Sequence, residues 1–193
     1  MDTNLTPEQS LKVIESMIGQ AKQSFQRMSF YFLLWGGLLL MATLGEYFAA
    51  AAGMSHGWLG WPVLGTVGGI IAGVHGSKEG RKQGASTFTD RVFLWLWSAF
   101  TVTLILLIVS LVSQGERPGP YVSLLTGLPT FVTGALLRFR PLMLGGVLFW
   151  VLGLVSLFVW PEGGALLFGA ALVFGYIVPG YMLKRQEDGL RTA

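Results

Sequence analysis

Apolar residues recur along the chain in six runs, each bounded by charged residues or by turns rich in Gly and Pro. The runs approach the ~20 residues that an α-helix needs to cross the ~30 Å hydrocarbon core of a bilayer. The segment "SKEGRKQGASTFTD" is the one long polar connection, and no room remains for a soluble domain. The pattern therefore predicts an all-α polytopic membrane protein with six transmembrane helices, at residues 29–52, 58–76, 91–113, 121–137, 142–160 and 165–183.

The first 28 residues follow a different, amphipathic pattern. The tetrapeptide "TPEQ" at residues 6–9 combines an N-cap Thr, a Pro at the first helical position and a Gln at the capping-box position. An apolar stripe then runs along one helical face, with Lys, Glu and Gln on the others. We expect an amphipathic helix on the cytoplasmic membrane surface or docked on the bundle, and binding of a partner is the alternative. The domain division is thus an amphipathic helix at 1–28, the bundle at 29–183 and a short cytoplasmic tail at 184–193.

Composition supports a membrane class, since 52% of the residues are hydrophobic and only 12% are charged. The basic residues then predict an orientation. Twelve of the 13 Lys and Arg residues fall on one side of the predicted bundle, and Arg117 lies opposite. Because cytoplasmic loops carry the excess of Lys and Arg, both termini are expected in the cytoplasm. The candidates for binding acidic lipid headgroups are Lys78, Arg81, Lys82, Arg138, Arg140, Lys184 and Arg185.

Residues 65–84, "GTVGGIIAGVHGSKEGRKQG", resemble a phosphate-binding loop at first sight. A Walker A loop needs Lys directly after its last Gly, whereas Gly76 is followed by Ser. Small residues four positions apart instead let two membrane helices approach closely. The second span is therefore expected to be central and tightly packed, with a hinge as the alternative use of its glycines. The predicted helix-packing residues are Gly65, Gly69, Gly73 and Gly76.

Few side chains in this sequence are suited to catalysis or to metal binding. The chain has no Cys, and its two His residues, His56 and His75, are predicted at opposite membrane faces. No carboxylate pair lies within a span, so neither a catalytic constellation nor a metal site nor a cofactor is predicted. Nucleic-acid binding is disfavoured despite a net charge of +3, because the basic residues are spread along one membrane face. No oligomeric state follows from the sequence.

Glu46 is the only carboxylate within a predicted span, near its outer end. Interfacial placement, with the carboxylate in water, is one interpretation. The other is a cavity that opens outward, because polar groups within spans often face a bundle interior. The candidate solute site on that view comprises Glu46, Tyr47, His56 and Trp58, with the hydroxyls of Thr126 and Thr130 deeper in the bundle.

The stretches "SLKVIESMIGQAKQSF", "SFYFLLWGGLLL" and "IVPGYMLK" together resemble a family of small uncharacterised bacterial six-span integral membrane proteins. The resemblance implies a bacterial inner-membrane location and, through an association with DNA-binding regulators, a role in regulation. We therefore expect a non-enzymatic membrane protein that acts as a regulatory or interaction partner, with membrane lipids and a protein on the cytoplasmic face as its partners. The alternative is a small-solute transporter, or a substrate-binding transport subunit, with an outward-facing site near Glu46.

Overall fold

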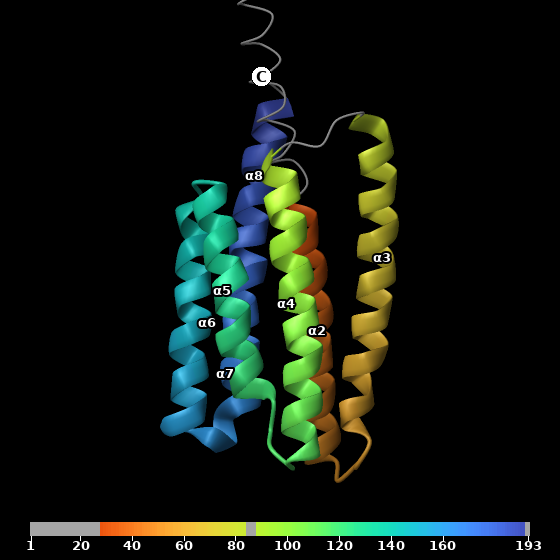
Figure 1. The fold of residues 1–193 in the computed structure, drawn as a ribbon. Coiled ribbons are helices and arrows are strands. Elements are labelled where there is room, and N and C mark those ends of the chain that lie inside the picture. Colours follow the sequence, from red (N-terminus) through yellow and green to blue (C-terminus); the bar gives the residue numbers. More distant parts are fainter. Residues whose placement is uncertain (1–27, 84–87, 192–193) are drawn as a thin grey trace, which may run out of the picture.

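The computed structural model describes residues 28–83 and 88–191 (Figure 1), so the amphipathic helix predicted over 1–28 lies outside the described residues apart from Met28. Long helices, labelled as in Figure 1, account for most of this part of the chain. The helices are α2 (Met28–Ala51), α3 (Gly60–Gln83), α4 (Phe88–Ser113), α5 (Gly119–Leu136), α6 (Arg140–Phe158), α7 (Gly164–Leu172) and α8 (Val178–Arg191). Two 3₁₀ turns, η1 (Gly57–Leu59) and η2 (Pro161–Gly163), precede α3 and α7, and a π-helical segment, η3 (Val173–Ile177), joins α7 to α8.

The described residues confirm the all-α class and are consistent with a membrane protein. Five helical segments of the described chain are long and apolar enough to cross a membrane: Met28–Ala51, Gly57–Lys78, Asp90–Ser113, Arg140–Phe158 and Pro161–Gln186. The 18 residues of α5 are less apolar because Ser, Thr, Gly and Pro recur among them. The count of six spans and the side on which each end lies remain predictions.

Helices connected by a turn run antiparallel, whereas α7, η3 and α8 continue in one direction (Figure 1). The start of α2, the α5–α6 turn and the end of α8 share one end, drawn at the top, which we call the basic end. The charged side chains described there are those of Lys78, Arg91, Arg138, Arg140, Lys184 and Arg185, together with the carboxylates of Asp90 and Asp188. The opposite end, called the acidic end, carries Glu46, Glu116 and Glu162 against Arg117 alone.

Helices extend further at the basic end than the sequence predicts. The polar connection expected over residues 77–90 is largely helical, because α3 continues to Gln83 and α4 begins at Phe88. The expected tail 184–193 continues α8 as far as Arg191. Lys, Arg, Gln and Glu are good helix formers, so an apolar helix can continue through a polar segment that is rich in them.

The tightest packing lies between α5, α6 and η3, where glycines allow backbones to touch. A Cβ built on Gly145 of α6 would lie 2.5 Å from the carbonyl oxygen of Gly175 in η3. One built on Gly146 would lie 2.8 Å from the carbonyl oxygen of Gly127 in α5. Such contacts exclude any larger side chain, and they increase dispersion contacts in lipid, where helix association has no hydrophobic driving force.

An aromatic cluster fills the centre beside these glycines. Tyr176 in η3 lies edge-on to Phe149 of α6, with ring centroids 5.1 Å apart, and to Phe32 of α2 at 5.3 Å. All three are almost completely buried. The π-helical turn contains Gly175 and Tyr176 as neighbours, so the backbone contact with α6 and the aromatic centre arise from the same distortion of the helix.

The expectation that span two is central is wrong for this chain, because α3 lies at the edge of the bundle (Figure 1). Only 6% of its apolar window is buried. Gly68 and Gly76 face α2, where Cβ atoms would meet Trp35 and Leu38 in the first case and the Tyr31 hydroxyl in the second. No atom lies within 4 Å of a Cβ built on the remaining predicted packing glycines, which are Gly65, Gly69 and Gly73.

The spacing of four residues was correctly read as a helical face. Two such faces exist on α3, however, and the sequence does not say which of them contacts α2.

Candidate functional site

Glu46 lies at the acidic end, where it fastens α3 to α2. The indole Nε1 of Trp61 donates a hydrogen bond to Oε2 of Glu46 over 2.6 Å. The η1 turn passes close by, because a Cβ on Gly57 would lie 2.7 Å from that of Ala49 and 3.2 Å from the Cα of Glu46. The carboxylate is otherwise exposed. This arrangement agrees with the interfacial interpretation of Glu46.

The other residues predicted at the outer end stay on the surface. Trp58 is 57% exposed and Tyr47 is 43% exposed. The His56 ring is exposed and its Nδ1 lies 3.1 Å from the hydroxyl of its neighbour Ser55. These side chains lie on the exposed surface around the α2–α3 turn.

Thr126 and Thr130, which were expected to line the deeper part of the same site, lie elsewhere. Both are buried in α5, and their hydroxyls donate to their own helix, at the carbonyls of Val122 and Thr126 respectively, each over 2.7 Å. The Thr130 hydroxyl also lies 3.3 Å from that of Tyr176. The structure therefore corrects the predicted site: its outer residues lie around α2 and α3, whereas its two hydroxyls are buried in α5 and bonded there.

The remaining polar groups of α5 join helices to one another. The hydroxyl of Ser123 donates to the carbonyl of Phe149 in α6 over 2.9 Å. Trp97 Nε1 of α4 donates to the Thr133 hydroxyl over 3.3 Å. Among the described buried side chains, only the Ser156 hydroxyl has no hydrogen-bond partner. On α5, Ser123, Thr130 and Thr133 thus make hydrogen-bond contacts with other helices, whereas the Thr126 hydroxyl bonds within its own helix.

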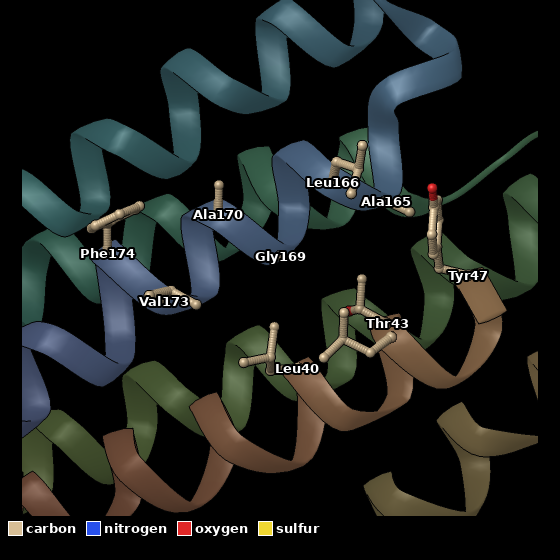
Figure 2. A pocket seen from close by; sticks show the side chains of 10 residues that line it. Leu40, Thr43, Tyr47, Ala165, Leu166, Gly169, Ala170, Val173 and Phe174 are labelled. Atoms are coloured by element: carbon tan, nitrogen blue, oxygen red, sulfur yellow. The ribbon is translucent and has the colours of Figure 1, made fainter.

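A groove of about 190 Å³ does occur between α2 and α7 (Figure 2). Figure 2 shows Leu40 and Thr43 of α2 facing Gly169 and Val173, with Tyr47 at the outer end beside Ala165. The Thr43 hydroxyl is already bonded to the carbonyl of Leu39 over 2.8 Å, so the lining offers almost no polar contact. The groove suits hydrocarbon better than a polar solute.

The basic end exposes most of the predicted headgroup-binding residues, and the carboxylates of Asp90 and Asp188 lie at the same end. Arg138, Arg140, Lys184 and Lys78 are exposed, and the Arg185 guanidinium lies 5.0 Å above the ring of Tyr181. These are five of the seven predicted headgroup-binding residues. The side chains of Arg81 and Lys82 lie outside the described residues.

Arg138 closes the α5–α6 turn with φ of 51°. Its amide donates to the carbonyl of Ala135 over 3.1 Å, and the next amide, of Phe139, donates to Gly134 over 2.8 Å. This pairing is a Schellman-type helix end, in which the left-handed position is usually Gly. The turn therefore holds a guanidinium where most chains have no side chain.

Sequence reasoning missed two residues that organise the molecule. Trp61 was not included in the predicted site, although the short turn between α2 and α3 brings its indole to Glu46. Tyr176 was not singled out, because a π-helical turn leaves no clear periodic signal.

The described residues contain no group of three or more His, Cys, Asp or Glu side chains arranged to hold a metal ion. Comparison with protein-family models, with curated proteins and with solved structures found no match for this chain.

Proposed function

We propose that this protein is a non-enzymatic membrane protein of the bacterial inner membrane that acts as a regulatory or interaction partner. It crosses the membrane six times, with the basic end and both termini in the cytoplasm. Its partner packs against α3 and α4.

The observation that carries this proposal is the contrast in burial between two groups of helices. Half of the apolar window of the α7–α8 segment is buried, and a third of that of α6. The corresponding share is 6% for α3 and 0% for α4. A lipid-facing helix ordinarily buries one side against its own bundle, so α4 in particular has an unusually small contact with the rest of the chain. Its large apolar side chains that are 55–69% exposed are Leu94, Trp95, Val102, Ile105, Leu106, Val109 and Val112.

The outward face of α3 supports the same proposal. A shallow surface hollow on this helix is lined by Gly69, Ile70, Gly73, Val74, Ser77 and Lys78. Small residues at this spacing allow a second membrane helix to approach closely. A solute-transport role would need a gathered polar site, and the polar residues expected to form one are separated between two parts of the bundle.

Photocrosslinking in living cells tests the proposal. The photoreactive residue p-benzoylphenylalanine would replace Ile70 or Val74 of α3 and Leu106 of α4. The matched control positions are Val151 and Leu154 of α6, which are 49% and 46% exposed. We expect a protein adduct of one discrete mass from the α3 and α4 positions only. Lipid adducts alone, or the same protein adduct from all positions, would contradict the proposal.

A further inference from the structure

We infer that the basic end holds a binding site for the phosphate of one anionic phospholipid, formed by Arg140 of α6 and Arg185 of α8. The inference depends on the placement of these helices in a membrane. It does not depend on the partner proposed for α3 and α4.

The first half of the site is a stripe along α6. Arg140, Leu144, Val147 and Val151 follow one another at intervals of four, three and four residues, which places them on one helical face. The apolar members are 68%, 38% and 49% exposed. A lipid-facing stripe on α6 thus ends, at the membrane surface, in a guanidinium.

The second half repeats this pattern on the neighbouring helix. Phe174, Val178, Tyr181 and Arg185 have the same intervals of four, three and four residues. The three apolar members are 61%, 42% and 51% exposed. The stripe also ends in an arginine at the basic end.

Both stripes lie on the same side of the helix pair. Gly145 and Gly175 face each other across the α6–η3 contact, and the two helices are antiparallel. Leu144 and Phe174 each come directly before these contact residues. In an antiparallel pair of right-handed helices, the residues that precede two facing positions turn toward the same flank.

The guanidinium groups of the two arginines also come to similar heights along the helix axes. Arg140 lies five residues from Gly145, or about 7.5 Å along the axis, and Arg185 lies ten residues from Gly175, or about 15 Å. Helical side chains tilt toward the N-terminus, so that of Arg140 extends outward and that of Arg185 turns back toward the membrane. The position of the Arg185 guanidinium over Tyr181, one turn closer to the membrane, agrees with this direction.

Local charge favours an anion at this point. Arg138 and Lys184 add positive charge beside the two arginines, against the carboxylate of Asp188 on α8. The left-handed backbone conformation of Arg138 costs roughly 1 kcal/mol or more of stability, and Gly at this position would avoid that cost. The turn therefore carries a basic side chain in spite of backbone strain. The N-terminus of α6 points to the same end and carries partial positive charge.

The chemistry of the ligand follows from these contacts. A guanidinium binds phosphate through two parallel N–H donors, so two arginines can hold one phosphate group from both sides. The exposed apolar stripes below them fit the two acyl chains of a phospholipid. A soluble acidic protein could contact the arginines but could not reach apolar stripes that lie in hydrocarbon.

Native mass spectrometry of the full-length protein tests the site. The protein in detergent would be titrated with phosphatidylglycerol and with phosphatidylcholine that carry the same acyl chains. We expect retention of one phosphatidylglycerol in preference to phosphatidylcholine. The double variant Arg140→Gln/Arg185→Gln should weaken this retention roughly tenfold or more, because charge-assisted bonds to phosphate are lost.

The matched control is Lys78→Gln/Arg91→Gln, which removes two exposed bases from the same end on α3 and α4 and should retain the lipid like the parent chain. Equal weakening by both pairs would show attraction to bulk charge only, and would overturn the site. Should the Gln pair fail to fold, Arg140→Lys/Arg185→Lys keeps both charges but loses the paired donors. Retention by this variant equal to that of the parent chain would likewise overturn it.

Discussion

Gly145 lies so close to Gly175 that a Cβ on the former would sit 2.5 Å from the carbonyl oxygen of the latter. The obstacle is backbone rather than a flexible side chain, so it cannot move aside cheaply. This contact fixes α6 against the π-helical turn. It thereby also fixes Tyr176 against Phe149 and sets the relative heights of Arg140 and Arg185.

Replacement of Gly145 tests this contact. Gly145→Ala should lower the free energy of unfolding by about 1–3 kcal/mol, the usual cost of overpacking, visible as a lower melting temperature in detergent. Gly69→Ala is the control, because nothing lies within 4 Å of its Cβ position. The control should leave stability unchanged or raise it slightly, since Ala favours helix over Gly. A greater loss from the Gly69 variant would place the tight interface on α3 after all.

Two buried serines on neighbouring helices provide a second test. Ser123 and Ser156 are each 3% exposed, but only Ser123 has a hydrogen-bond partner. Ser123→Ala should cost about 1 kcal/mol and leave the Phe149 carbonyl unsatisfied. Ser156→Ala removes an unpaired hydroxyl and should be neutral or stabilising. Calorimetry in detergent measures the melting temperature of each variant. A lower melting temperature for Ser156→Ala than for Ser123→Ala would show that the Ser156 hydroxyl has a hydrogen-bond partner.

The bond between Glu46 and Trp61 should matter for attachment of α3 rather than for solute binding. Glu46→Gln keeps an acceptor oxygen, so the melting temperature should change little, whereas Glu46→Leu and Trp61→Phe should each destabilise by up to about 1 kcal/mol. Because both remove the same bond, the double variant should be no worse than either single variant. Additive losses in a double-mutant cycle would mean that the two side chains act independently.

Hydrophobic pattern and the charge distribution were sufficient to predict the helical membrane class and the approximate helix positions. They could not predict which face of α3 contacts α2, because Gly65, Gly69 and Gly73 form as regular a stripe as Gly68 and Gly76. Packing partners depend on the shapes of other helices, which periodicity does not encode.

The candidate site shows the same limit. Glu46 lies exposed near the end of α2, as its position in the sequence predicts, and its place relative to the membrane boundary stays a prediction. Thr126 and Thr130 were grouped with it because both sets are polar, but a polar side chain in a membrane helix can bond to its own backbone and line no cavity. Only the three-dimensional arrangement separates these two uses. The stripes below Arg140 and Arg185, by contrast, are legible in the sequence as intervals of four, three and four residues.

Cysteine accessibility tests the membrane placement on which the proposed function and the lipid site both depend. The chain has no Cys, so single cysteines can be introduced without background labelling. Suitable exposed positions are Ser55, Gln114 and Glu162 at the acidic end, and Arg138 and Gln186 at the basic end. Intact cells would be treated with a membrane-impermeant maleimide after removal of the outer-membrane barrier, if one is present. We predict labelling of the three acidic-end cysteines in intact cells and of the two basic-end cysteines only after the inner membrane is permeabilised. Labelling of Arg138→Cys or Gln186→Cys in intact cells, or protection of any acidic-end position, would contradict a six-span bundle with its basic end in the cytoplasm.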